Sequence, residues 1–577
     1  MRDLMRPTEQ SDSVDATPPK RESMRVPSQA SASRASGAAR AFPKRIGILN
    51  DYVRIPFANG SSFASQFFYR EFMTRGHEVT IVGPTDPVAQ PHEMPQRYVE
   101  LPSVPFKNHP GVRLTLPAPA AFKALAAENL DVALGQSNTH LLQAGVWLRH
   151  EHNVPFLPVN TVHLPSVYNV VLPDSLMKNP LINGVFTEAL IPMLERQSAA
   201  VYNHSDGLIV LAEGLKKYWE ARGVTVPIHV IPRPIEPKIF DVPQPNDPYP
   251  ADFTKGARLV VVCRHTREKS VSRLLEIFAR HILREVPEAT LTLVGDGPDH
   301  DHFRAEAEAL GVMHRCSFPG EVALKNVPAY YAHGDVFVYT SLSETYGQVV
   351  SEALWCGLPV VALSDGMGVD QQLIDGENGF LVPQGDDNLR ADAQFGRDVV
   401  GLLVNHDKRR EMGRRAAEIT RHRSDPSRCI GRFYDAFEAS RAHLDATRAE
   451  RARDGYKKRF AMINWTGIHL AAAALGLVRQ PSIVNRHGRK PPTWDELLDT
   501  ATPAVPAVKA APERTLRAVE AAPAPLSPAG IGAEQLATSI AAAQKVAARE
   551  VRLRARATSA ARLTLASDAR RRAPAAE

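Results

Sequence analysis

The sequence predicts an α/β protein with two doubly wound, mostly parallel sheets, and three observations support this prediction. From residue 44 onward, short apolar runs alternate with segments that have helical periodicity. A Pro-rich connector at residues 230–250 interrupts the alternation, which then starts again. Hydrophobic residues make up 44% of the 577 residues, which is enough for a large core. Such alternation is typical of parallel sheets that helices cover on both faces.

The first half of the pattern, residues 44–240, contains apolar runs that are predicted as strands. These are IGILN (46–50), EVTIVG (78–83), DVALGQS (131–137), VPFLPVN (154–160) and GLIVLAE (207–213). A loop with the sequence NGSS (59–62) is predicted between the first strand and a helix at 63–76. Further helices are predicted at 140–152 and 186–200.

The second half, residues 251–428, repeats this organisation. Strands are predicted at ARLVVVCR (257–264), ATLTLVGDG (289–297), RCSFPGEV (315–322), DVFVYTS (335–341) and LPVVALSDG (358–366), and helices at 270–283 and 300–311. A helix that starts at Cys429 is predicted to follow, over 429–447. Two such domains form a cleft between the carboxyl ends of their sheets, which is where ligands of open α/β sheets usually bind.

The net charge of +6 is located at the C-terminal end. Residues 501–577 hold twelve Lys or Arg against six Asp or Glu, so residues 1–500 are neutral in total. A nucleic-acid-binding core would normally carry its own concentrated basic face, so no nucleic-acid partner is expected. Residues 1–43 and 501–577 are rich in Ala, Pro, Ser or Arg and lack periodicity, which predicts disorder at both ends.

Cysteine usage and the most apolar segments predict a cytoplasmic protein. The four cysteines form no C-x-x-C pair, so neither a zinc site nor a disulfide framework is indicated. The N-terminus lacks the apolar run of a signal peptide, and the most apolar stretch, 468–478, is far shorter than the ~20 residues of a membrane span. Residues 448–500 are basic and then apolar, which predicts either an interfacial helix on anionic lipid of the inner membrane face or a helix packed on the core.

The densest motif is SLSETYGQVVSEALWCGLPVV, residues 341–361. It places Glu344 just after an apolar strand, Gly347 in the first turn of a helix, and Glu352 within that helix. A loop carboxylate can accept hydrogen bonds from sugar hydroxyls, while the free N–H groups of a helix start can hold phosphate oxygens. The alternative interpretation is that Glu344 caps the helix and Glu352 is a solvated surface acid.

Two cations and several glycine turns lie at other strand ends. Arg264 ends the first strand of the second half and Lys269 follows five residues later, an arrangement that suits a diphosphate leaving group, although a solvated basic loop is the alternative. Gly295 belongs to a turn in LVGDGPD, and Gly366 and Gly368 follow a later strand. Single glycine pairs are weak evidence, but here they recur at successive strand ends.

Taken in order, these motifs and GENGFLV (376–382) resemble the donor half of family-4 retaining glycosyltransferases of the GT-B fold, in which two Rossmann-like domains face a cleft. The resemblance covers residues 44–440. It implies a nucleotide-sugar donor bound by the second domain, an acceptor bound by the first, and neither a metal nor another cofactor. Arg264 and Lys269 would bind the diphosphate, Glu344 the sugar and Glu352 the ribose. The full implied donor-binding set is Gly60, Arg264, Lys269, Gly295, Glu344, Thr345, Tyr346, Gly347 and Glu352.

The first half resembles the subgroup that includes sulfoquinovosyl- and glucosyl-diacylglycerol synthases, through residues 100–117, 130–156 and 160–168. Family members usually carry a Tyr-His-Thr run at the end of the fifth strand. In this chain the run contains Asn160, so either His163 takes the role of the His or Asn160 replaces it. We favour His163, which joins Glu344, Arg264 and Lys269 as the implied catalytic set.

The resemblance implies that a hexose moves from a nucleoside-diphosphate sugar, with UDP favoured, to a lipid such as diacylglycerol, with retention of configuration. The same chemistry on a soluble or polysaccharide-intermediate acceptor is the alternative. A nucleotide-sugar-binding protein without turnover is a third hypothesis, motivated by Asn160 and by Arg233, which stands in the connector where relatives commonly have an Asn-Gly pair. Arg233 would contact either an anionic ligand or only the hinge.

Overall fold

The computed structural model describes residues 42–455, apart from 52, 54–59, 87–88, 90–93, 106–112, 116–118, 137–140, 162–190, 342–343 and 385–386. Several predictions therefore concern residues outside this range. They are the predicted role of His163, the predicted disorder of residues 501–577 and of most of 1–43, and the predicted extension beyond Gly455.

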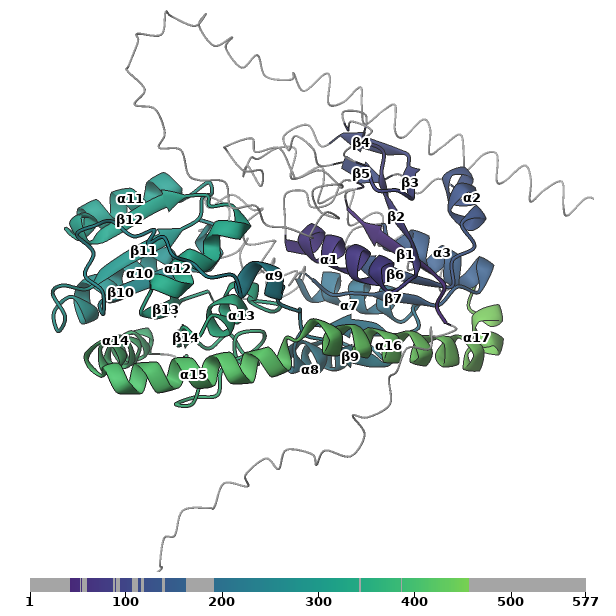
Figure 1. Cartoon of the computed structure of the whole chain (residues 1–577). Coiled ribbons are helices and arrows are strands. Elements are labelled where there is room, and N and C mark those ends of the chain that lie inside the picture. Colours follow the sequence, from purple (N-terminus) through teal and green to yellow (C-terminus); the bar gives the residue numbers. More distant parts are fainter. Residues whose placement is uncertain are drawn as a thin grey trace, which may run out of the picture. The chain divides into compact units, whose positions relative to one another are not determined.

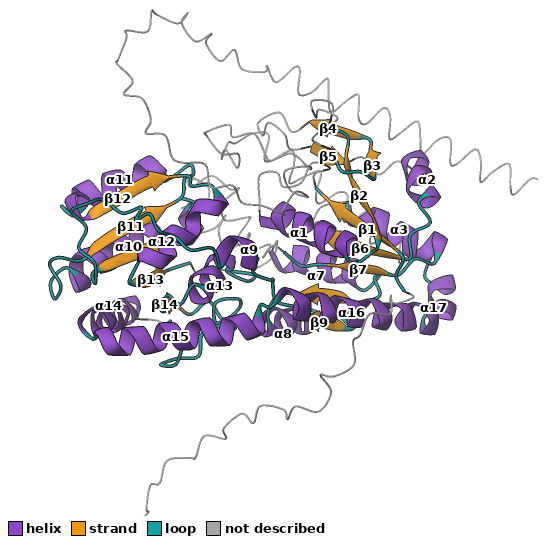
Figure 2. Ribbon diagram, in the orientation of Figure 1, coloured by secondary structure: helices purple, strands orange, loops and turns teal. Residues whose placement is uncertain are grey.

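The first half forms a parallel sheet with the strand order β3-β2-β1-β6-β7 (Figures 1 and 2). The strands are β1 (Arg45–Asn50), β2 (Glu78–Pro84), β3 (Tyr98–Leu101), β6 (Val132–Gln136) and β7 (Phe156–Pro158). Ile46 pairs with Val79 on one side and with Val132 on the other, so β1 is central. The central strands are buried and apolar because helices cover both faces, as predicted.

Smaller elements complete this half. A bridge from Val159 to Ile209 continues the sheet toward a parallel pair, β8 (Leu208–Val210) and β9 (Ile228–Val230). An antiparallel pair joins β4 (Ser103–Pro105) to β5 (Arg113–Thr115). The helices are α1 (Gly60–Thr74), α2 (Pro119–Ala127), α3 (Leu142–His152), α7 (Ile191–Tyr202), α8 (Glu213–Ala221) and α9 (Pro237–Phe240).

The start of α1 corrects one prediction. We expected Gly60, Ser61 and Ser62 to lie in a loop, but α1 begins at Gly60. The first turn of a helix has no intrahelical partners for its N–H groups, and Gly and Ser are well tolerated at that end. The residues that looked like a loop are therefore the helix start.

The second half forms a six-stranded parallel sheet with the order β12-β11-β10-β13-β14-β15. Its strands are β10 (Arg258–Val262), β11 (Thr290–Val294), β12 (Cys316–Gly320), β13 (Val336–Tyr339), β14 (Val360–Leu363) and β15 (Gly379–Val382). Its α-helices are α10 (Val271–Ile277), α11 (His300–Ala309), α12 (Val327–His333), α13 (Gln348–Trp355), α14 (Asn388–Val404) and α15 (His406–Arg423). Helix α10 continues as the π-helix η4 (Phe278–Ile282). Short 3-10 turns are η3 (Arg267–Lys269), η5 (Met313–Arg315) and η6 (Leu324–Asn326).

The strand order locates the expected binding edge. β10 pairs with β11 on one side and with β13 on the other, so the chain connections diverge between β10 and β13. Ligands of doubly wound sheets bind at such a switch point, beyond the carboxyl ends of the strands. Arg264 follows β10 and Glu344 follows β13, so both belong to this edge.

After the second sheet, the chain returns to the first half through α16 (Pro426–Ala446) and α17 (Arg448–Arg453). The ring of Phe433 lies 4.6 Å from that of Phe68 on α1. α16 starts three residues before the predicted Cys429, because Asp425 caps it by accepting a hydrogen bond from the Arg428 N–H at 2.8 Å and Pro426 fits the first turn.

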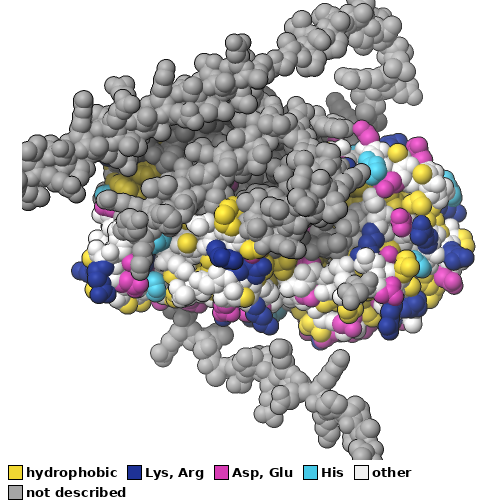
Figure 3. Space-filling model, turned by 180° about the vertical axis from the view of Figure 1, so that it is seen from behind, with side chains coloured by type: hydrophobic (Ala, Val, Ile, Leu, Met, Phe, Trp, Pro, Cys, Tyr) yellow, Lys and Arg dark blue, Asp and Glu magenta, His cyan; other side chains and the backbone are white. Residues whose placement is uncertain are grey.

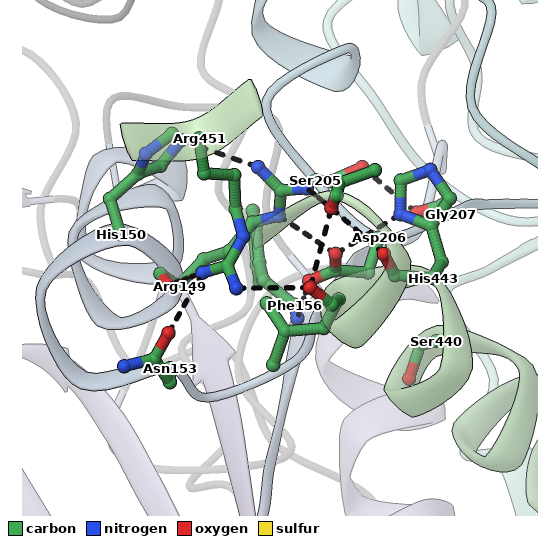
Figure 4. A network of polar contacts seen from close by, with 12 residues as sticks. Arg149, His150, Asn153, Phe156, Ser205, Asp206, Gly207, Ser440, His443 and Arg451 are labelled. Carbon is green, nitrogen blue, oxygen red and sulfur yellow. Dashed lines mark hydrogen bonds and ion pairs between the residues drawn. The ribbon is translucent and has the colours of Figure 1, made fainter. Parts of the chain in front are cut away.

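A buried network fixes this returning segment (Figure 4). Asp206 is fully buried and accepts from Arg149 Nε at 2.8 Å and from the Phe156 N–H at 3.1 Å, and His443 Nδ1 lies 3.2 Å from it. Arg451 of α17 donates to the Arg149 carbonyl at 3.0 Å. The network therefore joins α3, the start of β7, the turn before β8 and both C-terminal helices.

Charges of both signs are interspersed over the described surface that Figure 3 shows, in keeping with the neutral total of residues 1–500. All four cysteines are free thiols. Within residues 42–455, none of the described helices has the length and apolar character needed to cross a bilayer.

Candidate active site

Glu344 lies beyond the carboxyl end of β13, and three donors converge on one of its oxygens. The hydroxyls of Tyr339 and Ser341 each donate to Glu344 Oε1 at 2.7 Å, and the Lys269 ammonium donates to the same atom. Burial by itself would raise the pKa of Glu344, but Lys269 and the hydroxyl donors outweigh it and lower the pKa. Glu344 is therefore an ionised carboxylate in a fixed orientation.

Lys269 ends the 3-10 turn η3 and is fixed by the end of β13. Thr340 Oγ1 donates to the carbonyls of Lys269, at 3.2 Å, and of Ser270, at 3.0 Å. Burial would lower the pKa of Lys269, but the carboxylates of Glu344 and Glu268 outweigh it and raise the pKa. A protonated ammonium has three donors, so Lys269 can bind an anion while it keeps its bond to Glu344.

The turn after Glu344 leads into α13 through Gly347. Gly347 has a φ of +76°, which favours glycine, and it is the N-cap of α13 without a side-chain cap bond. The alternative that Glu344 caps this helix is therefore wrong. Gly368 packs so closely on this turn that a Cβ there would lie 2.6 Å from the Glu344 carbonyl oxygen.

Asp365, in the loop after β14, supports the same turn. It accepts the backbone N–H of Glu344 at 3.0 Å and that of Met367 at 2.8 Å. Burial raises the pKa of Asp365 to about 6, although these N–H donors oppose the shift. The carboxylate thus ties two strand-end loops together.

Glu352 lies one and a half turns into α13 and is 6% exposed, so it is not a solvated surface acid. The Tyr331 hydroxyl donates to Glu352 Oε2 at 3.1 Å. Burial raises the pKa of Glu352 to about 8, while hydrogen bonds from Tyr331 and Gln348 and the charge of Arg233 oppose the shift. Glu352 is mostly protonated at neutral pH and can donate or accept a hydrogen bond.

Arg264 and Gly295 lie at the ends of β10 and β11. The Arg264 side chain is exposed, and among the described residues none forms an ion pair with it. A Cβ at Gly295 would lie 1.9 Å from the Cys263 carbonyl oxygen, and the φ of +133° also requires glycine. Next to them, the ring of His265 stacks on that of His300 with centroids 4.9 Å apart, and burial lowers the pKa of His265 to about 4.

The first half reaches this edge through Thr161, whose carbonyl accepts from the Thr345 hydroxyl at 3.1 Å. A small pocket lies beside it, lined by Thr161, Arg233 and mainly apolar residues of the first half and α16. Asn160 is 1% exposed and donates to the Tyr202 hydroxyl at 3.2 Å, so its amide is engaged in the interior. The predicted role of Gly60 stays a prediction, since only its place at the start of α1 is described.

The structure brings Lys269, Glu344, Thr345, Gly347 and Glu352 to one edge, and Arg264 and Gly295 follow the neighbouring strands. Tyr346 differs from them, because its ring is buried and its hydroxyl lies 3.1 Å from Ser424 Oγ and 3.0 Å from Ser351 Oγ. Only its backbone lies in the turn. Sequence reasoning missed the supporting residues, which are Tyr331, Tyr339, Thr340, Ser341 and Asp365.

The arrangement can bind a polar, anionic ligand. The cations at the strand ends and the helix start suit phosphate oxygens, while the ionised Glu344 suits hydroxyl groups. Among the described residues, His, Cys, Asp and Glu form no cluster that could hold a metal ion.

Two family descriptions match the chain. Residues 249–418 match "Glycosyl transferases group 1" and residues 66–238 match "Glycosyltransferase Family 4". Together the two matches cover more than half of the chain, and each corresponds to one of the two sheets with its helices.

Similar proteins include enzymes with different acceptors. The alpha-monoglucosyldiacylglycerol synthase of Streptococcus pneumoniae is 25% identical over 326 residues, which are 55% of this chain and 70% of that protein. The GDP-mannose-dependent alpha-mannosyltransferase of Mycobacterium tuberculosis is 26% identical over 64% of this chain and 90% of its own. The sulfoquinovosyl transferase SQD2 of Arabidopsis thaliana is 36% identical, but over only 21% of this chain and 23% of its own.

Solved structures show the same fold. Sucrose-phosphate synthase from Thermosynechococcus elongatus aligns with a TM-score of 0.53 at 19% identity, over 69% of this chain and 100% of its own. HepE from Anabaena, solved in complex with UDP and glucose, aligns with a TM-score of 0.51 at 16% identity over the same shares. Both alignments support the two-domain GT-B architecture.

Proposed function

The chain belongs to the family-4 glycosyltransferases of the GT-B fold, and from this premise we propose that it transfers a hexose from a nucleoside-diphosphate sugar to a lipid acceptor such as diacylglycerol. We further propose that the donor is UDP-linked, that the configuration at the anomeric carbon is retained, and that no metal is needed.

The observation that carries the proposal is the Lys269–Glu344 pair, held by Tyr339 and Ser341 beside the start of α13. A glycosyl donor presents a diphosphate and a ring of hydroxyls to the same site. Lys269, Arg264 and the N–H groups near Gly347 supply positive charge for the diphosphate, and Glu344 accepts from the sugar hydroxyls. Glu352 lies further along α13, where it can bond a ribose diol.

In the proposed reaction, the acceptor hydroxyl attacks the anomeric carbon as the bond from that carbon to the diphosphate oxygen breaks. The diphosphate keeps the bonding electron pair and takes the proton of the acceptor hydroxyl, so the attack occurs on the face that the leaving group vacates. The chain contributes positive charge for the leaving group and a fixed orientation for the sugar. In this reaction the diphosphate accepts the proton and the chain supplies charge and orientation, which fits a site that is rich in oriented donors and cations.

The lipid acceptor is supported by the pneumococcal relative, whose name specifies a diacylglycerol glycolipid, and by the basic and then apolar sequence of residues 448–479. A soluble acceptor is the second candidate, since the mycobacterial relative is named as a GDP-mannose-dependent mannosyltransferase without a lipid. The third candidate, binding without turnover, is motivated by Asn160, whose side chain is engaged with Tyr202.

The test is a panel assay with the full-length chain. UDP-glucose, UDP-galactose, UDP-sulfoquinovose and GDP-mannose are each combined with diacylglycerol in mixed vesicles or with soluble glycans, and nucleotide release is measured together with product formation by mass spectrometry. We expect a UDP-sugar and the lipid to give an α-linked glycolipid. A soluble product alone would favour the second candidate, and tight donor binding without any product would favour the third.

A further inference from the structure

The connector between the two halves is fixed against the start of α13. Gln348, the first residue of α13, donates from Nε2 to the Pro234 carbonyl at 3.5 Å, and the Ile235 N–H donates to the Ser424 carbonyl at 3.0 Å. Gln348 also follows Gly347 directly and begins the helix that carries Glu352. The connector residues just before Pro234 therefore lie beside the helix start and the two carboxylates of the candidate site.

Arg233 is the residue that the connector directs to this place. It lines the small pocket of the first half together with Thr161, whose carbonyl bonds Thr345 of the opposite half. Pro234, the next residue, contacts Gln348 at the start of α13, so Arg233 also lies close to the helix that carries Glu352. Arg233 is thus a cation of the connector, between the pocket of the first half and the start of α13.

The charge on Arg233 persists in this partly buried position. Burial lowers its pKa to about 10, with Tyr346, Glu344 and Glu352 opposing the shift, so the side chain is still protonated at neutral pH. Glu352 is mostly neutral there, since its own pKa is raised to about 8, and Glu344 already accepts from Lys269 and two hydroxyls. Arg233 therefore carries a positive charge beside the start of α13.

We propose that Arg233 binds the diphosphate of the donor, as a third cation beside Lys269 and Arg264. This inference rests on the proposed function and adds to it a binding residue contributed by the connector. A diphosphate carries several negative charges, and Lys269 already shares its charge with Glu344, so a further cation is needed for neutralisation. A guanidinium also suits the role because its planar fork can bond two phosphate oxygens at once, which an ammonium cannot.

The position of Arg233 gives the contact a second consequence. A residue in the connector that binds the diphosphate links the ligand directly to the segment that joins the two halves. Donor binding would then favour the arrangement in which Thr161 and Thr345 are in contact, because the same ligand holds the connector against α13.

The experiment is calorimetric titration of the full-length chain and of Arg233→Ala and Arg233→Lys. UDP, GDP and ADP are first titrated into the wild-type chain, and the tightest of them and its parent nucleoside serve as probes. We expect Arg233→Ala to weaken nucleoside-diphosphate binding by about 10- to 100-fold, with nucleoside binding changed less than about twofold. Arg233→Lys should recover only part of the loss.

Arg70→Ala is the matched control, since Arg70 is also a nearly buried arginine that contacts the connector, through an ion pair with Glu236 at 2.9 Å. It should lose stability in a thermal melt but keep its affinity for the diphosphate within about twofold. If Arg233→Ala folds and binds the diphosphate as tightly as the wild type, the inference is wrong. It is also wrong if affinity falls only for a charged-sugar donor such as UDP-glucuronic acid and not for UDP.

These outcomes separate the inference from the proposed function. A wild-type chain that binds none of the three nucleoside diphosphates and transfers no sugar contradicts the proposed function, and with it the inference. A wild-type chain that binds and transfers, with no loss in Arg233→Ala, contradicts the inference alone. Equal losses of diphosphate and nucleoside affinity in Arg233→Ala would indicate a purely structural role and would also overturn it.

Discussion

At the scale of single residues, the Lys269–Glu344 pair sets the charge of the candidate site. Lys269→Ala would leave the carboxylate of Glu344 nearly buried with only hydroxyl donors, and it would remove the cation nearest to the leaving group. We expect a loss of about 10²- to 10³-fold in kcat/KM for this variant, and a comparable loss for Glu344→Ala. Steady-state rates with the donor and acceptor that the panel identifies provide the measurement.

Arg273→Ala is the control for the Lys269 experiment. Arg273 forms a similarly buried ion pair with Asp392 at 2.6 Å, in the same half of the chain. Its removal should lower thermal stability without lowering kcat/KM at a temperature at which the variant is folded. Unchanged turnover in Lys269→Ala or Glu344→Ala would show that the site assignment is wrong.

A second prediction at this scale concerns the pH dependence that Glu352 imposes on stability. Burial raises the pKa of Glu352 to about 8, well above the ordinary value in an unfolded chain. Between these two values the folded state holds a proton that the unfolded state has lost, so the free energy of unfolding falls as pH rises, by up to about 1.4 kcal/mol per pH unit. Above the folded pKa this dependence ends.

Glu352→Gln replaces the titrating carboxyl group with an amide that does not titrate. The unfolding free energy of this variant should therefore depend less on pH than that of the wild type. The urea midpoint of the wild type should fall between pH 5.5 and 7.5 more than that of Glu352→Gln, and the variant should be the more stable protein at pH 7.5. Identical pH profiles would show that Glu352 does not titrate differently in the two states. Asp365 has a raised pKa as well, to about 6, so the variant should retain a smaller slope below that pH.

The residues of the site were predictable where they follow one another in the sequence. Glu344, Gly347 and Glu352 occupy one motif, and their spacing predicts a strand end, a helix start and a helix. Tyr331 and Asp365 were not predictable, because each reaches the motif from another element. A tyrosine or an aspartate at a strand or helix end gives no signal of its own until the sheet order determines what lies opposite.

At the scale of elements, the loops at the strand ends depend on close backbone approach. Gly295→Ala would place a Cβ 1.9 Å from the Cys263 carbonyl oxygen at a φ of +133°. The β10 and β11 loops would have to separate, which we expect to cost about 3 kcal/mol or more of unfolding free energy and to abolish donor binding. Denaturant unfolding and nucleotide titration of the same variant test both effects.

Gly431→Ala is the matched control for this experiment. Gly431 lies within α16, and a Cβ there would meet nothing within 4 Å. Alanine favours the helix, so this variant should be more stable by roughly 0.5–1 kcal/mol and should bind the donor normally. If Gly295→Ala behaved like Gly431→Ala, close packing of the strand-end loops would not be required.

The returning helices provide another prediction for elements. Asp206→Asn would remove the charge that balances Arg149, whose side chain is 4% exposed, at the centre of the network in Figure 4. An unbalanced buried cation should cost about 3–5 kcal/mol of unfolding free energy. Arg441→Ala on α16 breaks the exposed pair with Asp445 and the contact of Arg441 with the Phe42 ring, and it should cost about 1 kcal/mol or less. Equal costs would contradict the buried role of Asp206.

The elements themselves were predictable where the apolar period is strong. The central strands of both sheets and the helices at 142–152 and 300–309 were located from it. The sequence reasoning did not identify α14 and α15, because their charged residues obscure the narrow apolar stripe that packs on the sheet. The starts of α1 and α16 were misplaced because Gly, Ser and Pro, which normally mark loops, are also the residues of a helix start.

At the scale of the whole molecule, the position of the net charge separates the catalytic body from the C-terminal residues. Residues 1–500 are neutral, while residues 501–577 hold an excess of six positive charges. The described residues of the candidate site all belong to the two sheets and their loops. With a lipid acceptor, we propose that the basic residues bring the body to an anionic membrane.

A shortened chain tests this role, and the structure determines where it can be cut. Arg451 donates to the Arg149 carbonyl and to Asn153, each at 3.0 Å, so the cut must follow α17, and a chain that ends at Gly455 preserves both contacts. Flotation with anionic vesicles should recover the full-length chain at least about tenfold better than the shortened one, and ~0.5 M salt should reduce the difference, because exposed charges are then screened.

The nucleotide affinities of the two chains should agree within about twofold. For the shortened chain, transfer to acceptor in vesicles should fall about tenfold, whereas transfer to detergent-dispersed acceptor should persist. Equal flotation of the two chains would contradict the membrane role, and a shared loss of nucleotide affinity would mean that the residues beyond 455 act on the catalytic body instead.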